Sequence, residues 1–257
     1  MDSGLDVTVR HHGQVVMVHP RGYLSLRTAR ELRQILVKEL LDHGRVVVDL
    51  DGFTVGPQSS WVMIFPAALA ECGGWPAAKI VLCRPNAPMT DALTARGVPT
   101  LVPVYHLQLE AEAAIDRRPS VVRKRTELPA NVWAPATARQ LIRDVCPLWQ
   151  VDDALQDTAE VVVNELVDVA VGPVAAAAEL TLERGPRGFR LAVHDAPQQV
   201  ALPGLPHRRQ ERWTDPLHRR RGLGLEMLEN LTAAWGVDVA SNGKTAWAVI
   251  ADEVPSA

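Results

Sequence analysis

The sequence predicts a two-domain α/β protein. Three observations indicate this: the length of 257 residues, short β-branched runs that alternate with amphipathic segments, and a polar break that ends at a proline. A chain of this length can form two hydrophobic cores of about 120 to 130 residues each. We place the break at residues 116–119 (DRRP), because proline disfavours a helix in the residue before it. The predicted domains are therefore residues 1–118 and 119–257.

The composition is that of an ordinary globular protein, with 47% hydrophobic residues, 22% charged residues and a formal net charge of −3. This net charge gives no global attraction to nucleic acid or anionic lipid. The N-terminus lacks the basic-then-apolar order of a signal peptide, and no apolar run approaches the ~20 residues of a membrane span. We therefore expect a cytoplasmic protein. An odd number of widely spaced cysteines favours free thiols: Cys72, Cys83 and Cys146.

The first half predicts strands and helices packed on a small sheet. Residues 14–18 (QVVMV) predict a strand, and the S/T-x-x-E spacing of Thr28 and Glu31 predicts the capped start of a helix that stops at Gly44. The β-branched run at 46–50 is typical of a strand covered on both faces. The other predicted elements are a strand at 79–83 and helices at 61–70, 89–96 and 107–115.

The second half predicts helices on one face of a mixed sheet. An edge strand at 121–128 precedes a helix that starts at Pro135 and a longer helix, capped by Asp152 or Asp153, that reaches about Val171. A hairpin across residues 185–188 follows. Residues 196–221 carry four prolines and no period, which predicts a functional lid or a mobile loop. The last predicted elements are a helix at 223–234 and a hairpin at Asn242-Gly243.

Four segments of the second half carry the parts of a nucleotide pocket: 161–171, 192–196, 219–228 and 242–250. They supply an acidic residue on a helix, an Asp that ends a strand, a glycine turn before a helix and a Thr near the last strand. Backbone amides at a helix N-terminus suit a phosphate, and an Asp at a strand end can recognise an exocyclic amine. The candidate residues are Glu165, Asp195, Arg221, Gly222, Gly224 and Thr245.

With the run LPANVWAPATARQLIRDV ahead of them, these segments resemble the anti-sigma-factor type of histidine-kinase-like (GHKL, or Bergerat-fold) ATPases. The resemblance implies an α/β sandwich that binds ATP or ADP with Mg²⁺. It implies that Glu165 acts in phosphoryl transfer and that Asp195 receives the adenine amino group. It also implies that Gly222 and Gly224 let backbone amides approach the phosphates, and that Thr245 supports the adenine contact.

The magnesium position of this family is altered. The family places its magnesium-binding Asn four residues after the Glu, about 40° further around the helix. Here that residue is Val169, which has no donor or acceptor. Asp168, about 100° away around the helix, is either a substitute ligand or an exposed carboxylate. Because a metal neutralises phosphate oxygens in phosphoryl transfer, this change predicts a larger loss of turnover than of adenine binding.

The first half is similar to STAS domains, the anti-sigma-factor-antagonist fold. The matching stretches are GQVVMVHPRGYLSLRTARELRQIL and RVVVDLDGFTV. In that family a Ser in the loop after the second strand is a phosphorylation switch. Counted from Asp49, that position is Gln58, which has no hydroxyl group. Ser59 and Ser60 follow, and they either shift the phosphorylation site or cap the next helix.

Six arginines gather between residues 208 and 221, and three interpretations remain open for them: a solvated loop, a phosphate contact or a surface for an acidic partner. Arg221, next to the glycine turn, is the candidate phosphate contact. Glu165 likewise is either a site residue or a solvated residue of an amphipathic helix. The order in which Asp195 and the glycine turn follow it favours the site.

The leading hypothesis is a regulatory protein of the sigma-factor partner-switching type, in which a STAS-like domain is fused to a catalytically impaired kinase-like domain. The alternative is an active serine/threonine kinase that phosphorylates a STAS-domain partner with ATP. A third reading, a DNA-binding regulator, rests only on the arginine-rich segment. The predicted partners are proteins, namely a sigma factor, an anti-sigma factor, a STAS protein or a second copy of this chain, rather than nucleic acid or membrane.

Overall fold

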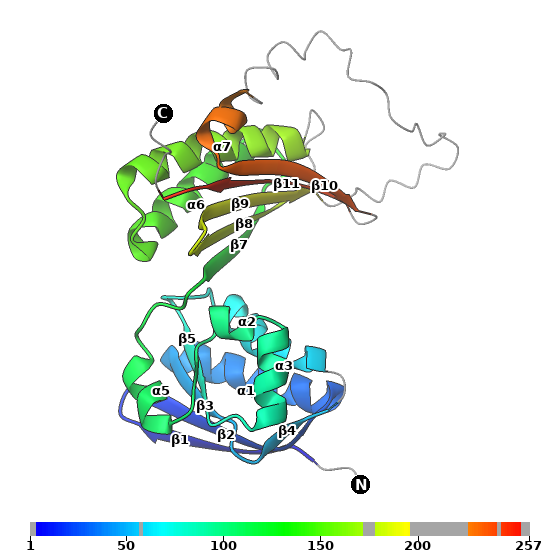
Figure 1. Cartoon of the computed structure of the whole chain (residues 1–257), viewed down its shortest axis with the longest axis vertical. Helices are drawn as coiled ribbons and strands as arrows, with labels where there is room; N and C mark the ends of the chain where they lie inside the picture. Colours follow the sequence, from blue (N-terminus) through cyan, green and yellow to red (C-terminus); the bar gives the residue numbers. More distant parts are fainter. Residues whose placement is uncertain (1–3, 57–58, 172–177, 196–225, 241–242, 253–257) are drawn as a thin grey trace, which may run out of the picture. The chain divides into compact units, whose positions relative to one another are not determined.

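The computed structural model describes residues 4–56, 59–171, 178–195, 226–240 and 243–252 (Figure 1). The chain divides into two compact units, Met1–Lys124 and Arg125–Ala257. Each unit has its own sheet, so the protein is of the mixed α/β class, as the sequence predicted. The division falls inside the strand β7, a few residues after the break predicted from the sequence. Within the described ranges, no helix is both long and apolar enough to span a membrane.

The N-terminal unit contains a sheet with the strand order β1-β2-β3-β5-β6. β1 is antiparallel to β2, whereas β2, β3, β5 and β6 pair in parallel, and β4 pairs in parallel with the last residues of β2. The parallel strands therefore share one carboxyl edge. The strands are β1 (Asp6–His12), β2 (Val15–Leu24), β3 (Arg45–Asp49), β4 (Phe53–Val55), β5 (Lys79–Cys83) and β6 (Val104–Tyr105).

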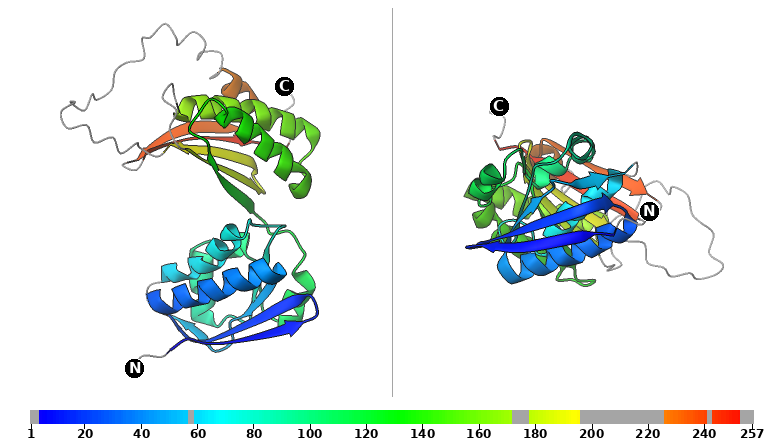
Figure 2. Two further views of the ribbon diagram at one scale, coloured as in Figure 1. Left: turned by 180° about the vertical axis from the view of Figure 1, so that it is seen from behind. Right: turned by 90° about the horizontal axis from the view of Figure 1, so that it is seen from below.

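Helices cover both faces of this sheet, as Figure 2 shows from two further directions. Val46 and Val48 of β3 point into the larger core, together with residues of α1, α2 and α3. Val47 lies in a second cluster with Ala111 and Ile115, at α5 and directly after it. This explains the uninterrupted apolar run of β3. The helices are α1 (Leu26–His43), η1 (Ser59–Met63, a 3-10 helix), α2 (Ile64–Glu71), α3 (Ala87–Ala95), α4 (Val98–Leu101) and α5 (Gln108–Ala114).

The start of α1 differs from the prediction. The N-cap is Ser25, whose Oγ accepts a hydrogen bond from the Thr28 backbone N–H at 3.3 Å, while Thr28 Oγ1 accepts one from the Ser25 N–H at 2.7 Å. Thr28 is therefore the third helical residue and not the cap, and Glu31 instead pairs with Arg27 at 3.2 Å. Sequence spacing alone did not show whether Ser25 or Thr28 is the N-cap. The predicted stop at Gly44 is confirmed, because Gly44 is a left-handed C-cap with φ 73°.

The C-terminal unit contains a five-stranded sheet in the order β10-β11-β9-β8-β7. β8, β9, β11 and β10 pair antiparallel in succession, and β7 lies at the edge as predicted. α6 and α7 pack against each other and cover one face of the sheet (Figure 1). The elements are β7 (Val122–Leu128), α6 (Ala134–Trp149), α7 (Asp153–Val171), β8 (Ala178–Gly185), β9 (Gly188–Asp195), β10 (Ala234–Ala240) and β11 (Gly243–Ile250).

Local signals account for most boundaries of this unit. The Leu155 N–H donates to Asp152 Oδ1 at 2.8 Å, so Asp152 rather than Asp153 caps α7. The predicted helix at 223–234 ends earlier in the structure, because the last helical residue is Leu231 and Ala234 already begins β10; residues 223–225 lie outside the described residues. Pairing of β10 with β11 explains this difference, since Ala234 lies opposite Val249. The predicted lid at 196–221 lies outside the described residues.

Candidate functional site

Glu165 lies on α7, which packs against β9 and β11. Its neighbours Val163, Leu166 and Val167 are buried, while Glu165 itself is half-buried. Burial raises the pKa of the Glu165 carboxyl, and the nearby charge of Asp168 raises it further. This combination, an acid partly withdrawn from water and placed near a second acid, is common at functional sites.

The residue one turn after Glu165 is Val169, which is half-buried in the structure. An aliphatic side chain offers no oxygen to a hard cation. Asp168 is exposed and lies on another side of the helix. The described part of α7 therefore does not fit the magnesium site that the family resemblance implies.

Asp195 is the last residue of β9, and Thr245 lies on the neighbouring strand β11. The register pairs Asp195 with Lys244 and pairs Thr245 with His194. Paired residues of adjacent strands share a face and successive residues alternate, so Thr245 and Asp195 lie on opposite faces. A contact of 3.0 Å between His194 Nδ1 and Thr245 Oγ1 agrees with this placement.

Asp195 lies on the helix-covered face of the sheet. Phe189 has the same parity on β9, and its ring lies 6.2 Å from that of Trp149 on α6. Asp195 thus belongs to the layer between sheet and helices, whereas Thr245 faces the other side. The structure does not bring the two predicted adenine contacts together. Arg221, Gly222 and Gly224 lie outside the described residues, so the predicted phosphate contacts remain a sequence prediction.

Asp49, which the sequence analysis did not select, is the most deeply buried charged group among the described residues of the N-terminal unit, at 1% exposure. It ends β3 and accepts hydrogen bonds from Arg84 Nε at 2.9 Å and from the Asp51 backbone N–H at 3.2 Å. Its Oδ2 lies 2.8 Å from His19 Nδ1, and Arg84 Nη2 also donates to that oxygen. Burial alone would raise the pKa of Asp49, but these hydrogen bonds outweigh burial and lower it.

The Asp49 cluster lies at the carboxyl end of the stretch over which β2, β3 and β5 pair in parallel. His19 belongs to β2, Asp49 to β3, and Arg84 directly follows β5. Arg84 has a left-handed backbone with φ 52°, which is uncommon for a residue with a Cβ. Its side chain is 40% exposed and also pairs with Asp51 at 3.3 Å. A buried carboxylate therefore holds a guanidinium group in a fixed position at the surface.

The sequence did carry a signal for this cluster. Asp49 stands inside the run VVVDL, where a charged residue must be paired if the strand is covered on both faces. What the sequence could not supply was the partner. His19 and Arg84 are 30 and 35 residues away along the chain, and only the pairing of β2, β3 and β5 brings them together.

Ser59 is the first residue of η1, and the preceding Pro57 and Gln58 lie outside the described residues. The predicted cap of the following helix is wrong in its register. α2 starts only at Ile64, and its N-cap residue Met63 makes no side-chain capping hydrogen bond. The 3-10 turn separates the serines from the start of the α-helix. The phosphorylation reading of Ser59 is not tested by this geometry.

No protein-family model and no curated protein sequence matches this chain. Its N-terminal half resembles solved structures of anti-sigma-factor antagonists. A structure of an anti-sigma factor antagonist from Mycobacterium paratuberculosis is 19% identical and covers 45% of this chain and 97% of its own, with a TM-score of 0.39. The structure of the anti-sigma factor antagonist SpoIIAA in its unphosphorylated form is 12% identical and covers 43% of this chain and 96% of its own, with a TM-score of 0.34.

Proposed function

We propose that this chain is a regulatory protein of a sigma-factor partner-switching pathway, in which a STAS-like unit is joined to a kinase-like unit with impaired phosphoryl transfer. Its partner is a protein: a sigma factor, an anti-sigma factor or another STAS protein. The observation that carries the impaired-kinase part is α7, where half-buried Glu165 is followed one turn later by Val169. In this proposal Glu165 is kept, while the position at which the related family carries its metal ligand holds an aliphatic side chain that cannot bind a metal.

The N-terminal unit offers a surface suited to protein contact at the carboxyl edge of its sheet. Arg84 is fixed there by Asp49, and three apolar side chains on nearby elements are exposed: Tyr23 at 38%, Leu26 at 49% and Met63 at 39%. Tyr, Met and Arg are enriched in the cores of protein interfaces, where a pre-positioned side chain loses little entropy on binding. This chemistry supports a role in binding a protein partner.

The position of Tyr23 depends on a glycine. A Cβ at Gly56 would fall 1.6 Å from the Tyr23 hydroxyl oxygen, so the ring can lie against the backbone only where the residue is Gly. Gly56 comes directly before the segment that leads into η1 and Ser59. Tyr23 and the serine region are therefore neighbours. In our proposal, a partner that binds Tyr23 and Arg84 also covers the region where a STAS-type switch residue would lie.

A nucleotide remains part of the proposal for the C-terminal unit. Asp195 is half-buried at the end of β9, on the helix-covered face, where a carboxylate can accept a hydrogen bond from an exocyclic amine. We propose that ATP or ADP binds at this end of the unit and that Mg²⁺ adds little to its affinity. Thr245 has no part in this contact, because it lies on the opposite face.

One observation favours the alternative of an active serine/threonine kinase. The raised pKa of Glu165 brings its carboxyl closer to neutral pH, which suits a group that accepts a proton from an attacking hydroxyl. An active kinase would still need a rearranged metal site, with Asp168 as the nearest hard ligand in sequence.

ATP affinity measured with and without Mg²⁺, followed by phosphate transfer to a STAS-domain protein, separates the two functions. Our proposal predicts nucleotide binding that changes less than about tenfold with Mg²⁺, which corresponds to about 1.4 kcal/mol, and no transfer. Tight magnesium-dependent binding with transfer to a serine would replace the proposal by the kinase. Absence of any nucleotide binding would remove the nucleotide from the proposal and leave the protein-binding role of the N-terminal unit.

A further inference from the structure

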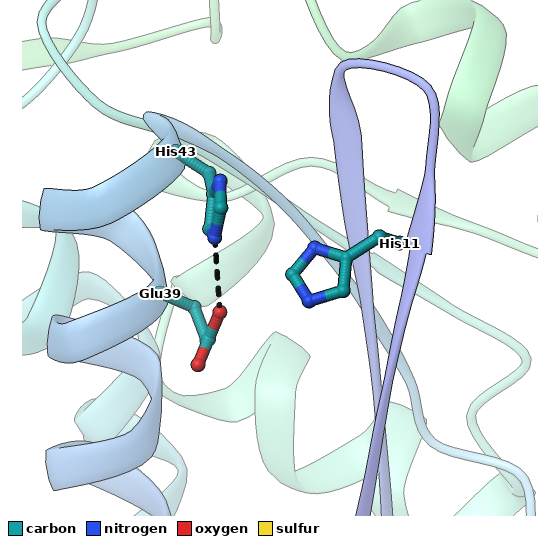
Figure 3. Close-up of side chains that lie close together, drawn as sticks. All are labelled: His11, Glu39 and His43. Atoms are coloured by element: carbon teal, nitrogen blue, oxygen red, sulfur yellow. Dashed lines mark ion pairs between the residues drawn. The ribbon is translucent and has the colours of Figure 1, made fainter.

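Three side chains of types that can bind a metal ion lie close together at the last turns of α1 in the N-terminal unit (Figure 3). Glu39 and His43 lie one turn apart on the helix, and His11 approaches them from β1. One ligand atom from each residue lies within 4.8 Å of the other two. The Glu39 Oε2 and His43 Nε2 atoms are 3.6 Å apart, and the two imidazole ring centres are 4.9 Å apart.

The positions of these residues along β1 and α1 explain why their side chains face one another. Residues four apart on a helix share a face, so Glu39 and His43 project together. On β1, Val7 and Val9 pack against the core on the α1 side, and His11 has the same parity. His12, the next residue, has the opposite parity, and its Nδ1 lies 4.0 Å from Glu112 of α5 instead.

We propose that His11, Glu39 and His43 form a binding site for a zinc ion. Two imidazole nitrogens and one carboxylate oxygen are a usual three-residue ligand set for zinc, with a water in the fourth position. Zinc bonds of about 2.0–2.2 Å in a tetrahedron place ligand atoms about 3.3–3.6 Å apart. The Glu39–His43 distance already matches this, and the exposed His11 ring can turn to close the site.

The burial of Glu39 gives the site a reason to hold a cation. Glu39 is 6% exposed, and a carboxylate at that depth is rarely found without a charged partner. Lys38 donates to its Oε1 at 3.0 Å, which leaves Oε2 directed at His43. Zinc at Oε2 would neutralise the carboxylate while Lys38 keeps its contact with Oε1.

Nitrogen ligands decide which metal fits. Imidazole binds zinc and other late transition metals well, whereas Mg²⁺ and Ca²⁺ prefer sites made entirely of oxygen. A bound zinc would also join β1, the edge strand of the sheet, to the C-terminal end of α1. The ion should therefore raise the unfolding temperature, because the folded chain has the site and the unfolded chain does not.

The test is a titration of the full chain with ZnCl₂ in a buffer with a non-chelating reductant, read by calorimetry and by thermal unfolding. We expect a zinc-dependent rise in unfolding temperature that MgCl₂ does not reproduce. His11→Ala and Glu39→Gln should each weaken zinc binding at least tenfold. The matched controls His12→Ala and Asp42→Asn, which change a neighbouring histidine and a neighbouring acid, should leave it unchanged.

The His11→Ala variant is the main test, because His11 is exposed and its replacement leaves the core of the unit intact. Glu39→Gln, a change at a buried residue, is interpreted only together with His11→Ala and with the circular dichroism of the zinc-free variants. Equal zinc affinity in wild type and His11→Ala would overturn the proposal, as would the absence of any zinc-dependent shift in the wild type. Slower hydrogen exchange of the β1 amides with zinc, lost in His11→Ala, would support it.

Discussion

Asp49 in the N-terminal unit and Glu165 in the C-terminal unit are two acids whose pKa values are shifted in opposite directions. Asp49 is almost fully buried, yet its pKa is lowered because Arg84, His19 and the Asp51 N–H all bind the charged form. Glu165 is only half-buried, yet its pKa is raised by burial and by Asp168. Burial raises the pKa of both carboxyls, and only at Asp49 do hydrogen bonds to the charged form outweigh it.

In our proposal the difference also separates a structural acid, Asp49, from a functional one, Glu165. Asp49 stabilises the folded state through complete hydrogen bonding, and its effect outside the core is to fix Arg84 at the surface. Glu165 sits in an environment that disfavours its charge, and that unfavourable balance is what a bound ligand or a transferred proton would relieve. The following predictions test this contrast, from the largest expected effect to the smallest.

Replacing Asp49 by Ala should cost the most. The change leaves Arg84 and His19 without their shared acceptor, and breaking a buried ion pair costs about 3–5 kcal/mol. Because the Arg84 side chain is 40% exposed and can turn towards water, we expect the lower end, about 3 kcal/mol. Urea denaturation measures the loss, and hydrogen exchange of β3 and β5 amides assigns it to the N-terminal unit. Asp51→Ala, which removes only the exposed partner of Arg84, should cost about 0–1 kcal/mol; equal costs for the two variants would contradict a special role for Asp49.

The pH dependence of this stabilisation has a defined sign. The pKa of Asp49 in the folded state lies below the ordinary aspartate value of 3.8, so folding favours the ionised form. The stabilisation should be complete above about pH 5 and should be lost as the pH falls through the folded-state pKa. The difference in urea midpoint between wild type and Asp49→Asn should therefore be constant from pH 7 to about pH 5 and shrink below pH 4. A difference that persists unchanged at pH 3 would mean that Asp49 stabilises the fold through packing and not through its charge.

Elements specified by local signals were predicted well. The strand at 79–83 has the predicted bounds, because its apolar residues lie between polar residues and a proline-containing turn. The cap at Asp152 and the hairpin of β8 and β9 depend on residues within a few positions of each other. β1 was not predicted, since an edge strand with a mostly exposed surface has little apolar alternation. Local sequence patterns predict local structure, but an edge strand that is mostly exposed shows a weaker pattern.

The candidate site shows where sequence reasoning stops. Glu165 and Asp195 were selected from the order of the four segments and from the family resemblance, but the face on which Thr245 lies follows from the register between β9 and β11. A shift of one residue would move Thr245 to the helix-covered face. The Asp49 cluster and the group of His11, Glu39 and His43 depend on tertiary pairing in the same way. Single residues could be suspected from the sequence, whereas their partners required the fold.

A change at the metal position of α7 tests whether Glu165 belongs to a nucleotide site. Val169→Asn supplies an amide oxygen one turn after Glu165, where the related family carries its magnesium ligand. If the pocket is otherwise intact, magnesium-dependent ATP affinity should rise about tenfold, or about 1.4 kcal/mol, in a calorimetric titration. Val169→Ala, which adds no ligand, is the matched control and should bind as the wild type does. An unchanged affinity in Val169→Asn would show that α7 does not adjoin the phosphates.

The smallest effect should come from neutralising Glu165 itself. Because its folded-state pKa is raised above the ordinary glutamate value of 4.5, ionisation of Glu165 opposes folding at neutral pH and not at acidic pH. Glu165→Gln should therefore stabilise the chain by about 0.5 kcal/mol at pH 7, with the gain disappearing below about pH 4.5. Glu160→Gln, on the same helix, provides the contrast, because Glu160 pairs with Arg143 at 2.5 Å and its neutralisation should destabilise. If both variants lose stability at pH 7, Glu165 is a paired structural acid like Asp49, and the functional reading of α7 loses its physical basis.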